Sequence, residues 1–129
     1  MAENFGGSEA ENAPVPVFQA LILFGPFDAQ ILRRRVADNA HAAEIAEDLI
    51  AQAAQICRSE IVSHMLDPHR GTLLETSRLL GRRVFTLGVA WMVTGHAAFR
   101  NRIVAELLAA TTFPDWNRRH FIDTAEMMA

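Results

Sequence analysis

No tyrosine occurs among the 129 residues of the chain, and cysteine, proline and glycine are scarce, with one, five and seven copies. The single Cys57 excludes an internal disulfide, and because it lies in an apolar helical pattern we expect a buried structural thiol. Half of the residues are hydrophobic and 21% are charged, which excludes a disordered or low-complexity chain. The composition therefore indicates one globular domain or part of one.

Basic residues are also too few to dominate the surface, because the chain has 12 Lys and Arg but 15 Asp and Glu. The resulting net charge of -3 argues against a nucleic-acid-binding surface. Residues 1–13 contain no Lys or Arg, which is the wrong charge for the start of a signal peptide. The apolar run at 15–24 contains Pro16 and Gln19 and is too short to span a bilayer. A cytoplasmic location is therefore the default expectation. A periplasmic location is the alternative if the intact parent protein has a different start.

Hydrophobic periodicity predicts an all-α chain of antiparallel helical hairpins joined by short turns. Residues 1–14 are predicted to form a mobile polar tail, and residues 15–129 one helical domain that starts with an extended stretch. Asp28 is the predicted N-cap of the first helix, in which Arg33, Arg34 and Arg35 form a solvated face. The predicted helices cover residues 28–37, 38–66, 72–94, 97–111 and 121–129.

The third predicted helix is apolar on most of its circumference, which is typical of a helix buried between neighbours. It starts with Thr72 and Glu75 at the spacing of a capping box. Gly81 and Gly88 share one of its faces and predict close helix packing there. In the predicted helix at 38–66, the residues expected to face the core are Ala42, Ile45, Ala46, Leu49, Ala53, Ile56 and Cys57. In the predicted helix at 97–111, they are Phe99, Ile103, Leu107, Leu108 and Ala110.

The stretch TTFPDWNRRHFIDTAEMMA at 111–129 has an order of polar and aromatic residues that helix periodicity does not explain. It follows a helix that ends in LGVAWMVTG at 87–95, and LILFGPFDAQILRRRVA stands earlier at 21–37. Together these segments resemble the N-terminal α/α-toroid domain of heparinase II/III-like polysaccharide lyases, including oligoalginate lyases. The resemblance covers residues 21–129, with Arg118 and Arg119 where the family has a proline and a small polar residue.

The resemblance implies an arc of an incomplete ring of paired helices, with a substrate cleft on one side. It also implies an enzyme that cleaves a uronate-containing polysaccharide, such as alginate or a heparan-type chain, by β-elimination. The family's Gly-Tyr-Asp-Trp helix and Asn-Trp-Asn catalytic loop do not occur in this sequence. The predicted last helix also has no C-cap glycine or closing proline, so we expect the chain to be the front part of a larger enzyme.

β-Elimination needs a group that neutralises the uronate carboxylate, a base for the C5 proton and an acid for the leaving O4 oxygen. The resemblance implies that a tyrosine and histidines, with an Asn or Arg, fill these roles. Because the chain has no tyrosine, we expect no catalytic residue in it and no lyase activity from the isolated chain. No cofactor is expected.

The chain is instead predicted to supply part of a substrate-binding wall. Trp116 would stack on a sugar face, and Asn117 and His120 would hydrogen-bond hydroxyl groups or a carboxylate. Arg118 and Arg119 would pair with a uronate carboxylate. The binding candidates are Trp116, Asn117, Arg118, His120 and Glu126. Two structural alternatives stay open at this point, namely that Trp116 plugs the turn after the fourth helix and that Asp115 caps a helix.

His120, Asp123 and Glu126 lie three residues apart along one side of the last predicted helix. Histidine and carboxylates on one face are compatible with a metal site, but no fourth ligand is evident, so we expect no metal. The pairs His41 with Glu44 and His64 with His69 are read as exposed polar positions.

A second interpretation is a stand-alone helical module without enzymatic activity. It would use exposed apolar helix faces to self-associate or to bind a partner helix. A third, a helical metal-binding protein, would require His120 as a ligand. No serine–histidine–acid order, glycine-rich phosphate loop or paired-cysteine motif supports another class of enzyme.

Overall fold

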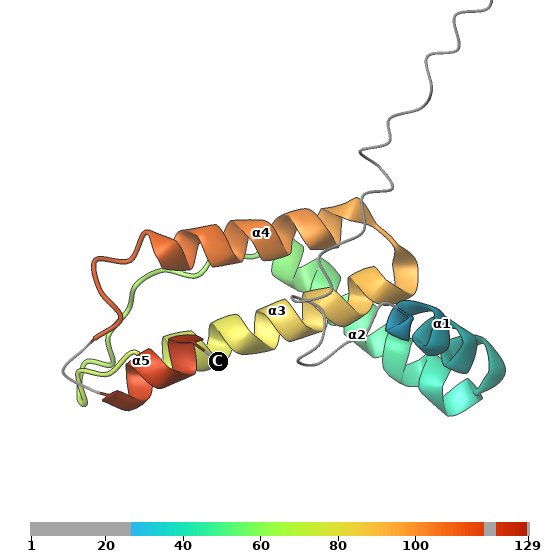
Figure 1. The fold of residues 1–129 in the computed structure, drawn as a ribbon, viewed down its shortest axis with the longest axis horizontal. Helices are drawn as coiled ribbons and strands as arrows, with labels where there is room; N and C mark the ends of the chain where they lie inside the picture. Colours follow the sequence, from blue (N-terminus) through green and yellow to red (C-terminus); the bar gives the residue numbers. More distant parts are fainter. Residues whose placement is uncertain (1–26, 118–120, 129) are drawn as a thin grey trace, which may run out of the picture.

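Helices make up all the regular secondary structure in the computed structural model, which describes residues 27–117 and 121–128. The all-α prediction is therefore confirmed for this part of the chain. The predicted tail and the apolar run before Phe27 lie outside the described residues. The helices are α1 (Asp28–Asp38), α2 (Ala40–Arg58), α3 (Leu74–Thr94), α4 (Ala97–Thr111) and α5 (Phe121–Met128) (Figure 1).

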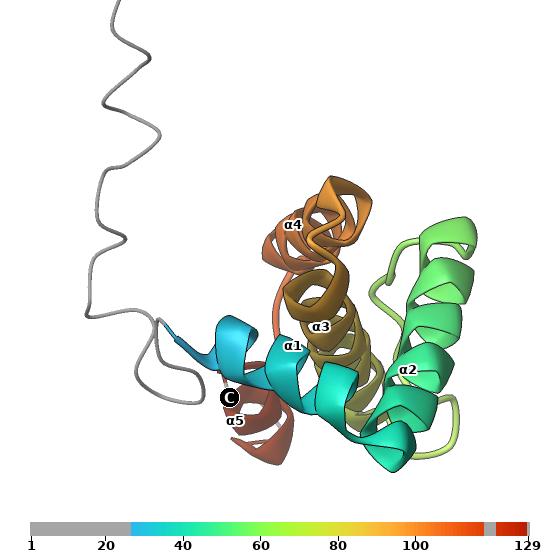
Figure 2. The same cartoon turned by 90° about the vertical axis from the view of Figure 1, so that its right-hand side faces the viewer.

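Helix α3 is the centre of the arrangement. Helices α2 and α4 pack along it, while α1 lies at its C-terminal end and α5 at its N-terminal end (Figures 1 and 2). Gly95 ends α3 in the left-handed conformation, with φ of 71°, and α4 starts two residues later and runs antiparallel to α3, as predicted (Figure 1). Among the described helices, none combines the length and the apolar character that a membrane span requires.

The first two helices start at different residues from those predicted. Asp28 is the first residue of α1, and the N-cap is Phe27, which makes no side-chain cap bond. Asp28 thus lies in the first turn, where the helix dipole favours a negative charge. Asn39 caps α2, because its Oδ1 accepts a hydrogen bond from the backbone N–H of Ala42 at 3.0 Å.

Arg33, Arg34 and Arg35 are all exposed, as predicted for a solvated face. The Nε of Arg33 also donates a hydrogen bond to the Met92 carbonyl at 2.7 Å. Arg33 therefore ties α1 to the last turns of α3.

The prediction that the second helix continues to Leu66 is wrong, because α2 ends at Arg58 and a non-helical connection follows to residue 73. Side chains of α3 and α4 bind the start of this connection, so its backbone groups find partners outside a helix. Tertiary contacts thus override the local helical pattern. The bonds are Val62 N–H to Glu106 at 3.0 Å, Arg83 to the Glu60 carbonyl at 2.8 Å and Arg102 to the Ser59 carbonyl at 2.8 Å.

The connection turns at residues 67–71, as predicted. Asp67 Oδ1 accepts hydrogen bonds from the backbone N–H groups of His69 and Arg70, both at 2.8 Å. The bond from Arg70, then that from His69, and the charge of Arg70 hold the pKa of Asp67 below its ordinary value of 3.8. Gly71 closes the turn with φ of 63°, a conformation that favours glycine.

The apolar core forms two groups along α3. The group toward α2 and the start of α4 consists of Ala53, Leu87, Ala90 and Phe99, surrounded by Ile50, Ile56, Cys57 and Ile103. The group toward α5 consists of Val62, Leu80 and Ala110, surrounded by Val84, Ala109, Phe113 and Met127. Cys57 is half-buried at the edge of the first group rather than buried as predicted. Both groups include residues of α3, but Phe85 and Trp91 of that helix are 55% and 39% exposed, so α3 is only partly buried between its neighbours.

Some residues predicted to face the core are exposed. Leu107 and Leu108 have exposed fractions of 46% and 59%, and Ile45 is also exposed. The buried side of α4 instead includes Phe99, Glu106 and Ala110. Helix α4 is apolar on both sides, so the spacing of its apolar residues could not identify the inner one.

The two helical glycines do not mark close packing, which corrects that prediction. A Cβ atom built on Gly81 or on Gly88 would meet no described atom within 4 Å. Nothing in the described structure therefore requires glycine at these two positions.

Replacing Gly81 with alanine is expected to raise the free energy of unfolding by up to about 1 kcal/mol, because alanine forms helix better and has room here. Urea denaturation followed by circular dichroism measures the change. Gly95→Ala is the matched control and should destabilise by roughly 1–2 kcal/mol, because Gly95 is left-handed. A loss of stability in Gly81→Ala would show that an undescribed segment covers this face.

Candidate functional site

Trp116 covers the C-terminal end of α4. Its Nε1 donates a hydrogen bond to the Ala110 carbonyl at 3.2 Å, and the hydroxyl of Thr124 in α5 donates to the Trp116 carbonyl at 3.1 Å. Trp116 thus plugs the turn after α4, which was the structural alternative. It also borders a hollow of about 530 Å³, together with Thr111, Phe113, Pro114, Asp115 and Thr124.

Asn117 is a structural link between the loop after α4 and the turn before α3. It has a left-handed backbone with φ of 55°, a conformation that asparagine tolerates better than most residues. Its Nδ2 donates to the Gly71 carbonyl at 2.9 Å and to Asp123 Oδ2 at 2.7 Å. Its backbone N–H donates to Asp115 Oδ1 at 2.7 Å, so Asp115 stabilises the loop and does not cap a helix. The side-chain Oδ1 of Asn117 receives no hydrogen bond from a described residue.

Asp123 of α5 is fully buried and caps α3 from outside that helix. Its Oδ2 accepts a hydrogen bond from the backbone N–H of Leu73, the N-cap residue of α3, at 2.6 Å. The predicted capping box of Thr72 and Glu75 is wrong, because α3 starts at Leu74 and no local side chain caps it. A carboxylate 50 positions away takes that place.

Glu126 lies apart from the hollow beside Trp116. It borders a different hollow of about 560 Å³ and pairs with Arg78 at 4.0 Å. Arg118 and His120 lie outside the described residues, as does Arg119. The structure therefore does not bring the described binding candidates into one site.

Metal-ligand geometry is absent from the part of the chain that the structure describes, where no three His, Cys, Asp or Glu side chains could hold an ion together. His41 and Glu44 are exposed, as predicted, with 3.7 Å between Nδ1 and Oε2. His64 corrects its prediction, because it is half-buried with its ring edge-on to Phe113 at a centroid distance of 5.4 Å. Its Nε2 is buried and has no hydrogen-bond partner among the residues that the structure describes.

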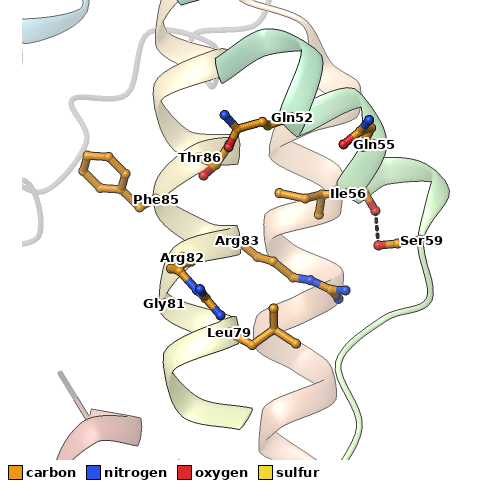
Figure 3. Close-up of a pocket in the computed structure, with 10 residues that line it drawn as sticks. All are labelled: Gln52, Gln55, Ile56, Ser59, Leu79, Gly81, Arg82, Arg83, Phe85 and Thr86. Atoms are coloured by element: carbon orange, nitrogen blue, oxygen red, sulfur yellow. Dashed lines mark hydrogen bonds between the residues drawn. The ribbon is translucent and has the colours of Figure 1, made fainter. Parts of the chain in front are cut away.

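A further hollow is a groove between α2 and α3, here called the α2–α3 groove, with a volume of about 640 Å³ (Figure 3). In Figure 3, Arg82 and Arg83 leave the same turn of α3, while Gln52, Gln55 and Ile56 extend from α2. The ring of Phe85 points away from α2, so only the base of that residue borders the groove. The residues around it are Gln52, Gln55, Ile56, Ser59, Leu79, Gly81, Arg82, Arg83, Phe85 and Thr86.

Beside this groove lies a buried charged group, here called the Glu106 cluster, which consists of Glu106, Arg83 and Arg102. Arg83 Nη1 lies 2.8 Å and Arg102 Nε 2.9 Å from Glu106 Oε1, and Oε2 accepts from the backbone N–H of Val62. The Glu106 side chain is fully buried. Two guanidinium groups for one carboxylate leave one positive charge in excess.

Sequence reasoning missed both buried carboxylates. Glu106 is the only acid in α4 and follows Arg102 by four residues, which is the spacing of a helical ion pair. An acid in an otherwise apolar helix was therefore the available signal. Asp123 gave no comparable local signal. Its partner Leu73 is 50 positions away, and its other partner, Asn117, lies in the loop after α4.

Comparison with known proteins adds no relative. No model of a protein family matches the chain, and a search of curated proteins finds no match. The resemblance to polysaccharide lyases therefore depends on the segments at 21–37, 87–95 and 111–129 alone.

Proposed function

We propose that this chain is the helical N-terminal piece of a heparinase II/III-like polysaccharide lyase, contributing scaffold and part of the cleft but not the catalytic centre. The observation that carries the proposal is the loop at 113–117, which has the polar and aromatic order of the family and borders a hollow of about 530 Å³. The packed antiparallel helices α3 and α4 are compatible with an arc of a toroid.

In this proposal, the loop binds a uronate-containing oligosaccharide through groups that its own fold leaves free. The Nε1 of Trp116 is used by Ala110, so the ring face would be the contact with a sugar. The carbonyl oxygen of Asn117 would accept a hydrogen bond from a sugar hydroxyl. Glu126 would serve a different hollow from Trp116, next to Arg78.

The chain alone is expected to produce no unsaturated uronate, because it has no tyrosine to serve as the proposed catalytic group. The test incubates purified chain with alginate and with heparan oligosaccharides and follows the absorbance of the unsaturated product. A sustained, enzyme-dependent rise in absorbance would overturn the inactive assignment.

Binding is tested separately by tryptophan fluorescence in a Trp91→Phe background, where Trp116 is the only remaining tryptophan. Uronate tetrasaccharide should change the emission of Trp116. Trp116→Ala in the native background should weaken the affinity, measured by calorimetry, roughly three- to tenfold, because it removes a stacking face of about 1 kcal/mol. An unchanged affinity in Trp116→Ala, or no binding to the native chain, contradicts the proposed cleft role.

The rival function is a stand-alone helical interaction module, and one observation favours it. The outer side of α4 exposes Val104, Leu107 and Leu108 next to one another. A folded module should unfold cooperatively and show one oligomer size across concentrations. A partial arc without its neighbouring helices should aggregate or melt gradually.

A further inference from the structure

The α2–α3 groove is positively charged, although the chain has a net charge of -3. Its lining includes Arg82 and Arg83, and none of the lining residues is acidic. Arg83 also belongs to the Glu106 cluster, which has one positive charge in excess, so the cluster and Arg82 together have an excess of two positive charges. A concave surface lined by one sign of charge attracts ligands of the opposite sign.

The two groove arginines differ in how much of their hydrogen-bonding capacity is used. Arg83 donates to Glu106 Oε1 and to the Glu60 carbonyl, so it is fixed in place. Arg82 is exposed and has no hydrogen bond or ion pair with a described residue. Its guanidinium group is therefore free to form the paired hydrogen bonds that a carboxylate or phosphate accepts. Arg82 also borders a second hollow that contains Glu75 and Glu126. Glu126 lies 4.0 Å from Arg78, and among the described residues neither carboxylate forms an ion pair with Arg82.

The rest of the groove suits a ligand that also has hydroxyl or amide groups. The side-chain amides of Gln52 and Gln55 make no hydrogen bonds with described residues, and Thr86 adds a hydroxyl group to the lining. The Ser59 hydroxyl already donates to the Ile56 carbonyl at 2.8 Å, so it can only accept from a ligand. Ile56 and Leu79 supply a short apolar wall. The volume of about 640 Å³ is within the range of small-molecule sites.

We propose that the α2–α3 groove binds a small organic oxyanion, with Arg82 holding the carboxylate or phosphate group and the glutamine amides holding the hydroxylated body. This proposal uses neither the loop at 113–117 nor the resemblance to lyases, so it stands or falls independently of the proposed function. Carboxylate and phosphate present the same oxygen pair to a guanidinium group, and the experiment separates them.

The experiment titrates the full, isotope-labelled chain with gluconate, glucose 6-phosphate and glucose, and follows backbone amide signals by NMR up to about 10 mM ligand. Shifts are expected for one or both anions, concentrated at the end of α2 with its C-cap (residues 52–59) and at residues 79–86 of α3, and not for glucose. Response to one anion alone also supports the site and identifies its oxyanion. Equal shifts with glucose, no shifts with either anion, or shifts centred elsewhere would overturn the proposal.

Arg82→Gln removes the charge from an exposed position and is expected to weaken anion binding roughly three- to tenfold without changing the melting curve. Arg82→Lys should have an intermediate effect, because lysine keeps the positive charge but cannot donate the paired hydrogen bonds of a guanidinium group. Arg34→Gln is the matched control, since Arg34 is exposed on α1 and away from the groove, and its affinity should equal that of the native chain. If Arg82→Gln binds as tightly as Arg34→Gln, Arg82 does not hold the anion and the proposal is wrong.

Discussion

Glu106→Gln is expected to lower the free energy of unfolding by about 3–5 kcal/mol, the largest single-residue effect in the described fold. The substitution keeps the shape of the side chain and removes its charge. Arg83 and Arg102 would then be left near each other, with side chains only 14% and 12% exposed and no carboxylate between them. Urea denaturation monitored by circular dichroism and by tryptophan fluorescence measures the loss.

The large effect follows from the position of the carboxylate. Its side chain has no exposed surface, and its two oxygens together accept from Arg83, from Arg102 and from the backbone N–H of Val62. The same arginines bind the carbonyls of Ser59 and Glu60. Loss of the charge should therefore also loosen the connection after α2, which hydrogen exchange at Val62 would detect.

Glu47→Gln is the control for the loss of one negative charge, because Glu47 is exposed on α2, and it should change stability by less than about 0.5 kcal/mol. Adding Arg83→Met to Glu106→Gln should recover part of the stability, since one uncompensated charge is removed. A loss below about 1 kcal/mol for Glu106→Gln, or no recovery in the double variant, would mean that the buried charge is compensated in some other way.

The sequence allowed the helices to be predicted wherever local signals decide them. Helix α4 has the predicted bounds, Ala97 to Thr111, because Gly95 ends the preceding helix and Pro114 prevents continuation. The turn at Asp67 and Gly71 was predicted for the same reason. Short-range backbone chemistry was sufficient in both places.

The errors occur where a distant side chain decides the local structure. Residues 59–66 continue a helical pattern, yet bonds from Arg83, Arg102 and Glu106 hold their start in an extended form. In α4, Phe99, Ile103 and Ala110 face the core as predicted, but Leu107 and Leu108 are exposed and Glu106 is buried in their place. Periodicity records which residues are apolar, but not which polar residue has a partner that compensates for its burial.

For the candidate site, the sequence predicted which residues lie together better than it predicted how their polar groups are used. Trp116 and Asn117 do lie together at the end of α4, but their N–H groups are used by Ala110, Gly71 and Asp123. The α2–α3 groove was not predicted, because it is formed by residues from α2 and α3 that are more than 20 positions apart. A groove of this kind becomes visible only when the packing of the two helices is known.

Asp123→Ala is expected to lower the free energy of unfolding by about 2–4 kcal/mol, because it leaves two donors without their acceptor. The N–H of Leu73, a fully buried residue, and the Nδ2 of Asn117 both donate to Asp123 Oδ2, at 2.6 and 2.7 Å. Each unsatisfied donor that stays buried costs about 1–3 kcal/mol, and Asn117 keeps its second bond to Gly71. Urea denaturation gives the total, and hydrogen exchange at Leu73 should accelerate well beyond the change in global stability if α3 loses its cap.

Glu126→Ala separates this effect from the loss of any acid in α5, because Glu126 is exposed one turn later and faces Arg78 only at 4.0 Å. It should cost less than about 0.5 kcal/mol and leave the exchange of Leu73 unchanged. Asp123→Asn should fall between the two, since its amide oxygen can still accept from Leu73 but the charge is lost. If Asp123→Ala proves as mild as Glu126→Ala, water replaces the carboxylate at the start of α3, and α5 contributes to the fold through its apolar contact at Met127 instead.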